Sequence, residues 1–127
     1  MKALREAVEA RDLPAIEALL ADDVVFRSPA VFTAYEGKPA AIHILRNVMD
    51  VFENFRYVTE AGSPDSPDSV LVFEAEVEGK QLTGCDILHV GADGLIDDFM
   101  VMVRPLSGLN ALATAMRARL TAPGAEE

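Results

Sequence analysis

The feature that most constrains the fold is a pair of apolar runs separated by a short, glycine-bounded link. The runs lie within residues 84–104, and the link spans residues 91–94 with the sequence Gly-Ala-Asp-Gly. A four-residue link that ends in glycine is typical of a β-hairpin turn. Because neighbouring side chains of a strand point to opposite faces, Asp86 shares a face with Leu88 and lies opposite His89. The pattern therefore predicts a long hairpin with one carboxylate in an apolar row.

Asp86 decides how the chain is interpreted, because a carboxylate among apolar side chains is costly to ionise without compensation. It could lie at the edge of the apolar row, or be bonded to the backbone or to a neighbour such as Tyr57 or Arg104. It could also be held at a raised pKa for a purpose, as a general acid, a general base or a ligand anchor. The residues alone leave these interpretations open.

Length and cysteine content narrow the class of protein. A chain of 127 residues suits one domain, which we expect over residues 1–121, followed by a C-terminal tail at 122–127. No uncharged apolar run approaches the ~18 residues that span a bilayer, and no apolar segment of a secretory signal follows the first residues. Together with the single cysteine, these features predict a cytoplasmic protein.

The net charge of −10 disfavours two kinds of partner. Nucleic acids and anionic membrane surfaces attract clustered Lys and Arg, and Lys80 is the only Lys or Arg between Tyr57 and Val103. We therefore expect neither a nucleic-acid nor a membrane partner. One cysteine and two isolated histidines lack the spacing of a metal cluster, so we expect no metal and no cofactor.

The remaining segments alternate between helical and strand-like patterns. Helices are predicted at residues 2–11, 12–22 and 38–52 and after Ser107, strands at 24–28, 55–60 and 70–78, and loops at 30–37 and 62–68. The helix at 38–52 has an apolar side with Ile42, Leu45, Met49 and Phe52, and a polar side with His43, Arg46, Asn47 and Asp50. The strand at 70–78 alternates, with Leu71, Phe73, Ala75 and Val77 facing inward.

This order of segments predicts an α+β domain whose curved antiparallel sheet wraps around the long helix and encloses a pocket. The chain resembles the NTF2-like (cystatin-like) superfamily, in its SnoaL-like and ketosteroid isomerase-like branch. The resemblance is carried by residues 12–16 (Asp-Leu-Pro-Ala-Ile), 21–26 (Ala-Asp-Asp-Val-Val-Phe), Gly37 and 93–96 (Asp-Gly-Leu-Ile). It implies a half-cone fold and a homodimer. It specifies no reaction, because this fold hosts enzymes and plain binding modules alike.

The resemblance also assigns positions around Asp86. In the isomerase branch this position holds an aspartic acid kept protonated to donate a hydrogen bond to the substrate. That branch places its catalytic base immediately before a proline, where this chain has Ser28. Its two tyrosine positions match Leu4 and Leu45. Without a base and the two hydroxyls, steroid isomerisation by that mechanism is not expected.

The inward positions predict an apolar pocket with one acid and one hydroxyl. Its predicted lining is Phe26, Ser28, Leu45, Met49, Phe73, Asp86, Leu88, Phe99, Val101 and Val103. The first hypothesis is that the pocket binds a small, largely apolar metabolite and catalyses cofactor-free isomerisation, cyclisation or dehydration with Asp86 as the acid. The second is a non-catalytic ligand-binding or assembly module in which Asp86 is structural. A third is a protein adaptor that uses the outer sheet face or the loop at 62–68.

Other reactive side chains are predicted to stay outside the pocket. His89 faces away from Asp86, His43 lies on the polar side of its helix, and Cys85 has no basic neighbour that would lower its thiol pKa. Asp97 has the parity of an inward residue and lies beside the turn. An arrangement like that of limonene epoxide hydrolase, with an arginine between two aspartates, would need Asp97 to join Asp86 in the pocket.

The outer face of the sheet predicts the mode of assembly. Its apolar strip, flanked by Glu74 and Glu76, consists of Val72, Ile87, Met100 and Met102 with His89 beside them. An apolar strip with a charged border is typical of a surface that a symmetric dimer buries. We expect a homodimer through this face, with Arg104 paired to Asp98 or to a carboxylate of the second subunit.

Overall fold

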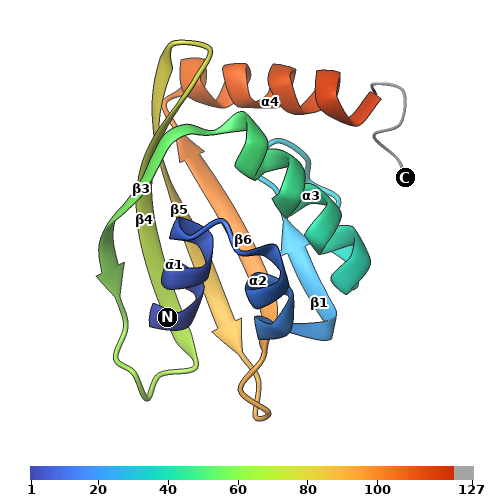
Figure 1. Ribbon diagram of the computed structural model, residues 1–127, viewed down its shortest axis with the longest axis vertical. Coiled ribbons are helices and arrows are strands. Elements are labelled where there is room, and N and C mark those ends of the chain that lie inside the picture. The colour runs from blue at the N-terminus through green and yellow to red at the C-terminus, as the bar shows by residue number, and fades with distance from the viewer. Residues whose placement is uncertain (122–127) are drawn as a thin grey trace.

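The computed structural model describes residues 1–121; the predicted tail at 122–127 lies outside the described residues. In this part of the chain, helices flank one six-stranded sheet (Figure 1). The elements are α1 Lys2–Glu9, α2 Leu13–Leu19, β1 Leu20–Arg27, β2 Tyr35–Glu36, α3 Lys38–Val51, β3 Glu53–Ala61, β4 Asp68–Val77, β5 Lys80–Val90, β6 Ile96–Arg104 and α4 Leu106–Thr121. No helix in residues 1–121 is long and apolar enough to cross a membrane.

The sheet has the strand order β2-β1-β6-β5-β4-β3, and with the helices it confirms the predicted α+β architecture. The strands β3 to β6 pair antiparallel, as expected. The expectation of a wholly antiparallel sheet is wrong at one point, because β1 runs parallel to β6 and places Phe26 opposite Phe99. A helix and four strands separate these partners along the chain, so no turn chemistry fixes their direction.

The predicted hairpin is confirmed as β5 and β6. Gly94, with a φ of +83°, closes its turn, and the amide of Gly91 donates to the carbonyl oxygen of Leu95 at 2.9 Å. Alternation along β5 buries Leu82, Gly84, Asp86 and Leu88, and alternation along β4 buries Leu71, Phe73, Ala75 and Val77. These two strands therefore form most of the inner face of the sheet.

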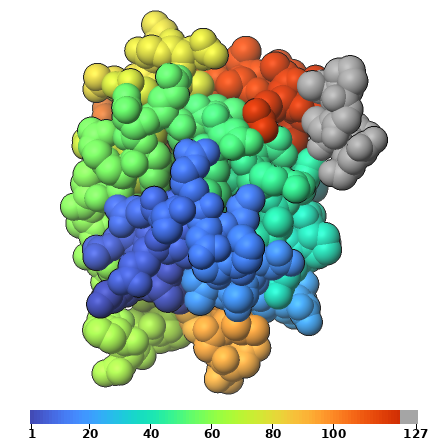
Figure 2. Space-filling view, in the orientation of Figure 1, coloured from blue at the N-terminus to red at the C-terminus, as the bar shows by residue number. Residues whose placement is uncertain are grey.

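The helices cover that inner face. Helices α1, α2 and α3 lie over one half, and α4 crosses the end of the sheet beside α3 (Figure 1). In the space-filling view α1, α2 and α3 form one continuous surface, and the β3–β4 loop and the β5–β6 turn project at the end away from α4 (Figure 2). The core has two clusters, one around Leu4, Ile16 and Phe99 and a smaller one in which Leu112 of α4 packs on Phe73.

Two local predictions are corrected by tertiary pairing. The helix predicted at 12–22 ends at Leu19, because Leu20 already pairs with Ile96 of β6. The predicted loop at 30–37 contains strand β2, whose Tyr35 lies opposite Phe26. Both changes follow from contacts with distant strands, which outweigh local propensity.

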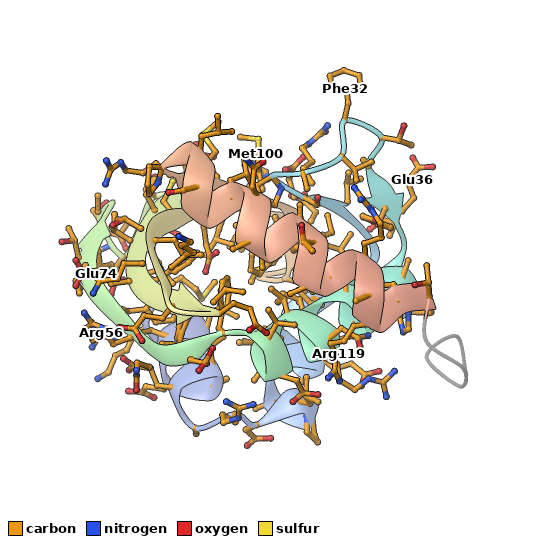
Figure 3. The ribbon with its side chains drawn as sticks, turned by 90° about the horizontal axis from the view of Figure 1, so that it is seen from above. Phe32, Glu36, Arg56, Glu74, Met100 and Arg119 are labelled. Atoms are coloured by element: carbon orange, nitrogen blue, oxygen red, sulfur yellow. The ribbon has the colours of Figure 1, made fainter. Side chains whose placement is uncertain are left out.

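Asn47 and His43 also differ from their predicted exposure. Asn47 is buried and His43 is half-buried. The side chain of Asn47 donates to the carbonyl oxygen of His43 at 2.7 Å and accepts from Nε of Arg119 at 3.0 Å. Arg119 belongs to α4 and points toward α3 (Figure 3). The side of α3 expected to face water is therefore covered in part by the last helix.

Candidate functional site

A cavity of about 490 Å³ lies between the inner sheet face, α3 and α4. Most of its lining is aliphatic or aromatic, which suits a small apolar molecule. The predicted residues found in the lining are Phe26, Ser28, Leu45, Met49, Phe73, Asp86, Phe99 and Val101. Leu4, at the position of the isomerase tyrosine, lines the cavity as well.

Leu88 and Val103 were expected in the lining and lie outside it. Leu88 is buried in the larger core cluster, and Val103 packs against the smaller cluster around Phe73 and Leu112. Both side chains have the inward parity that the sequence predicts. Helices pack directly onto these two positions, so an inward side chain there becomes core instead of cavity wall.

Asp86 lies in the cavity wall and is 5 % exposed. The hydroxyl of Tyr57 donates a hydrogen bond of 2.7 Å to its Oδ2 atom. Arg104, the other partner considered, is exposed at the end of β6. The interpretation of Asp86 as a residue at the edge of the apolar row is therefore wrong, and Tyr57 is its partner.

Burial and the Tyr57 bond act on the acid in opposite directions. Removal from water disfavours the carboxylate and raises the pKa of Asp86, while the donated hydrogen bond favours the carboxylate and lowers it. Burial prevails, and the pKa of Asp86 reaches about 7. The pKa of Tyr57 is raised by burial and by the neighbouring Asp86 charge, so its hydroxyl stays a donor.

The second carboxylate oxygen of Asp86 faces the cavity. The hydrogen bond from Tyr57 engages Oδ2 alone, and no other side-chain bond to Asp86 is formed within residues 1–121. Every fully buried side-chain oxygen or nitrogen in that part of the chain has a hydrogen-bond partner. Because Oδ1 has no such partner, it is not fully buried, and it can form a hydrogen bond with a molecule in the cavity.

The sheet holds the Tyr57–Asp86 pair across strand β4. Tyr57 of β3 lies opposite Phe73, and Asp86 of β5 lies opposite Leu71, so the two polar side chains meet diagonally over β4. The ring of Tyr57 also stands edge-to-face against Phe55, with 4.9 Å between ring centroids. Packing of this kind fixes the ring and hence the direction of its hydroxyl.

Several parts of the lining were not predicted, among them Tyr57 and helix α4. Tyr57 was named only as one potential partner of Asp86, and parity within a single strand could not choose it. Helix α4 adds Leu112, Met116, Arg117 and Leu120. The sequence predicted a helix after Ser107 but not its place over the cavity, where the Arg119–Asn47 bond joins it to α3.

Ser28 lines the cavity at the position of the isomerase base but has a turn-forming role. Its Oγ accepts hydrogen bonds from the amides of Ala30 at 3.1 Å and Val31 at 3.2 Å. A serine hydroxyl used in this way stabilises the bend that follows β1. The chain therefore offers no carboxylate at that point.

The outer face of the sheet carries a separate polar cluster. Nδ1 of His89 lies 2.6 Å from Oδ1 of Asp97, and Nη2 of Arg27 lies 3.3 Å from Oδ2 of Asp98. The prediction that Asp97 faces inward is wrong, because a register shift between His89 and Val90 turns the Asp97 side chain outward. Pairing of Asp98 with Arg104 is also wrong, since Arg27 takes that place.

Metal ligation and thiol chemistry find little support in the described residues. Within residues 1–121, no three His, Cys, Asp or Glu side chains gather in a way that could hold a metal ion. Burial raises the pKa of the Cys85 thiol, and the Asp86 charge raises it further. A thiol with a raised pKa is a poor nucleophile near neutral pH.

Solved structures share this architecture. A structure titled a steroid delta-isomerase, from Pseudomonas aeruginosa, is 43% identical with a TM-score of 0.86, over 91% of this chain and 84% of that one. A protein with a cystatin-like fold from Silicibacter pomeroyi is 34% identical with a TM-score of 0.90, over 96% and 85%. An NTF2-like protein of unknown function from Cytophaga hutchinsonii, 19% identical with a TM-score of 0.63 over 82% and 86%, shows the fold alone.

The family assignment rests on sequence as well as on shape. No curated protein matches the chain. The model of the SnoaL-like domain matches residues 1–99, which include α1 to β5 and the Tyr57–Asp86 pair. With most of its length matched and its fold shared with the NTF2-like structures, this chain belongs to the SnoaL-like family.

Proposed function

We propose that the cavity binds a small, largely apolar molecule and that Asp86 transfers a proton within it, in a cofactor-free isomerisation, cyclisation or dehydration. The observation that carries this proposal is the Asp86 carboxyl group, buried in an apolar cavity with Oδ2 bonded to Tyr57 and Oδ1 open. The function is proposed at this level of chemistry because the family itself specifies no reaction.

The pKa of Asp86 suits a group that both takes and returns a proton. At a pKa of about 7, the acid and the carboxylate are both populated near neutral pH, the condition under which general acid–base catalysis is most effective. In an isomerisation, Oδ1 would remove a proton from one carbon and return it to another, so that no external acid, base or cofactor is consumed. Tyr57 would hold the carboxyl group in place through Oδ2.

The steroid delta-isomerase relative suggests a reaction type to test, the migration of a carbon–carbon double bond. A base in the position used by the isomerase branch is absent, because Ser28 occupies it. Asp86 would therefore have to act as the base as well as the acid. A steroid-sized and a small β,γ-unsaturated ketone, such as 3-cyclohexen-1-one, are suitable substrates because conjugation of the product is seen directly by ultraviolet absorbance.

The test is to compare the wild type with Asp86→Asn and Asp86→Leu. We expect Asp86→Asn to lower kcat by about a hundredfold or more, the usual contribution of one general acid or base, while substrate binding changes little. Tyr35→Phe is a matched control, because Tyr35 lines the same cavity without forming a hydrogen bond to Asp86. Unchanged turnover in Asp86→Asn, together with a more stable Asp86→Leu, would contradict the catalytic proposal.

A non-catalytic ligand-binding or assembly module is the second candidate. The hydrogen bond between Tyr57 and Asp86 favours it, because a buried acid with a partner can serve the fold alone. The two candidates differ in turnover. A structural Asp86 predicts ligand binding without conversion, and binding that survives both substitutions.

We also propose a homodimer through the outer sheet face, in the cytoplasm, where a reducing environment suits the single cysteine. The apolar strip of Val72, Ile87, Met100 and Met102, next to His89, supports the dimer, and Met102 is 52% exposed in the single chain. Sedimentation of the wild type at micromolar concentration should give a dimer, and Met102→Lys should shift it toward monomer. A monomeric wild type would contradict the proposal.

A further inference from the structure

The cavity lining contains two arginines with different surroundings. Arg11 donates from Nη2 to the carbonyl oxygen of Met49 at 2.9 Å and lies 3.3 Å from Oδ1 of Asp50. The guanidinium group of Arg117 forms no hydrogen bond or ion pair within residues 1–121, and the hydroxyl of Thr121 donates to its backbone carbonyl oxygen. Arg117, which is exposed, therefore presents N–H donors beside the cavity that no group within residues 1–121 uses.

The charges are distributed along the cavity and do not cancel at one point. Burial and the Tyr57 bond account for the shift in the pKa of Asp86, and the Glu9 charge adds to the raised pKa of Tyr57. Neither shift has a contribution from an arginine. Asp86 of β5 and Arg117 of α4 thus line the cavity from different elements.

On helix α4, the side chains of Arg117 and Arg119 point in different directions. Nε of Arg119 donates to Oδ1 of Asn47, and its Nη2 lies 2.6 Å from Oδ2 of Asp50, both on α3. Residues two apart on a helix point about 200° from each other, so fixing Arg119 on α3 directs Arg117 to another side of α4. Figure 3 shows Arg119 at this end of α4, next to α3.

Helix α4 also lies beyond the part of the chain that the SnoaL-like model matches. That match ends at residue 99, and α4 begins at Leu106. Leu112, Met116 and Arg117 therefore add wall to the cavity from outside the matched region. Such residues are well placed to determine which ligand this particular chain selects.

We propose that Arg117 is the anchor for a carboxylate, so that the cavity takes an apolar organic acid in preference to a neutral apolar molecule. The inference rests on the proposed function, because it requires that the cavity bind a small molecule. A guanidinium group suits a carboxylate because its planar donors can bond both oxygens at once. With a net charge of −10, the chain as a whole repels anions, so selection of an acid must come from a local group such as Arg117.

Calorimetric titration with three probes of equal chain length tests the anchor. Decanoate, decan-1-ol and decyltrimethylammonium share a ten-carbon chain and carry an anionic, a neutral and a cationic head group, and at about pH 8 decanoate is ionised. We expect the wild type to bind decanoate about tenfold more tightly than decan-1-ol, the effect of one charge-assisted hydrogen bond. Arg117→Gln should abolish this preference and leave the affinity for decan-1-ol within about twofold.

Arg46→Gln is the matched control. Arg46 is an exposed arginine of α3 that lies outside the cavity lining and forms no ion pair within residues 1–121. Both variants lose one positive charge, so a general electrostatic effect would appear in each. The preference for decanoate should persist in Arg46→Gln and vanish only in Arg117→Gln.

The outcomes separate this inference from the function on which it rests. Decan-1-ol or the ammonium probe binding as tightly as decanoate would overturn the anchor, as would a decanoate preference that survives Arg117→Gln. Either result leaves the proposal of an apolar ligand cavity standing. Failure of all three probes to bind would overturn both the anchor and the ligand cavity.

Discussion

Strand β5 carries Asp86 and His89, three residues apart, on opposite faces of the sheet. Asp86 faces inward and accepts from Tyr57 at 2.7 Å, and His89 faces outward with Asp97 at 2.6 Å. The distances are nearly equal, but Asp86 is buried and His89 is exposed. The two pairs therefore differ in their surroundings far more than in their geometry.

This difference shows that the environment of a hydrogen bond, more than its length, determines how far the bond shifts the pKa of the group. Around Asp86 the loss of water outweighs the bond, and the pKa rises to about 7. Around His89 the bond to Asp97 is the largest influence and raises the imidazole pKa, while desolvation, the next largest, lowers it by less. Only the inner pair can couple strongly to folding, because solvent screens the outer pair.

The largest expected effect is a pH dependence of stability that belongs to Asp86. Its pKa is about 7 in the folded state against an ordinary 3.8, so between these values the folded chain binds more protons than the unfolded one. The contribution of this titration to the free energy of unfolding is then fully present below about pH 4. It is lost as the pH rises to about 7, and the loss is on the order of 4 kcal/mol in total.

Urea unfolding of the wild type and of Asp86→Asn between about pH 4 and pH 8 measures this effect. The variant lacks the titration, so its stability relative to the wild type should rise steadily across the interval and level off above about pH 7. A difference in the free energy of unfolding that stays constant with pH would show that Asp86 has the same pKa in the folded and unfolded states. The inner pair would then not couple to folding.

The second expected effect is steric and lies two residues before Asp86. A methyl group added at Gly84 would overlap the ring of Phe73 and lie 2.7 Å from the carbonyl oxygen of Met102. We expect Gly84→Ala to destabilise the fold by about 3 kcal/mol, the upper part of the usual range for overpacking. Cys85→Ala, on the opposite face, should cost less than about 1 kcal/mol. Partial recovery in Gly84→Ala with Phe73→Leu would identify the ring as the source, and equal costs at Gly84 and Cys85 would contradict the contrast between faces.

The same contrast separates what the sequence predicts from what it does not. Period-two alternation correctly placed Asp86 inward and His89 outward, because both lie within one regular strand. It failed for Asp97, which lies next to the register shift after His89. Alternation holds only as long as the ladder is regular, and one extra residue reverses the face of those that follow.

Predictions that depended on distant parts of the chain were less successful. The exposure of Asn47 was wrong because Arg119, which is 72 residues away, bonds to it. Leu88 and Val103 were correctly predicted to face inward. They do not line the pocket, because both pack into the core clusters that the helices cover. The sequence therefore predicts the strands and their faces, whereas the position of α4 decides the final shape of the cavity.

The third prediction measures the coupling of the inner pair. At about pH 8.5, where Asp86 is mostly ionised, Tyr57→Phe leaves a buried carboxylate without its donor and should cost about 1–3 kcal/mol. Combining it with Asp86→Leu removes both polar groups, so the double variant should be more stable than Tyr57→Phe alone. The pKa of Asp86 should also rise further in Tyr57→Phe. Additive effects of the two substitutions would show that the bond contributes nothing of its own.

The smallest expected effect lies on the outer face, where nuclear magnetic resonance can follow the imidazole of His89. Its pKa should lie above 6.5 because of the hydrogen bond to Asp97 and the charges of Asp97, Asp68 and Asp98. A His with a raised pKa stabilises the fold below the unfolded value, and this contribution is lost as the pH rises through the folded value.

Asp97→Asn should bring the pKa of His89 back toward its ordinary value, and the signals of His43 on α3 should not respond. In the monomeric Met102→Lys variant, where the pair is exposed, salt at about 1 M, which shortens the screening length to about 3 Å, should have the same direction of effect on His89. It should leave the titration of Asp86 almost unchanged, since the inner carboxyl group is not in contact with bulk solvent. A raised His89 pKa that persists in high salt would contradict an exposed pair. In the wild type it would instead agree with burial of this face against a second subunit, because only exclusion of solvent protects a charge pair from mobile ions.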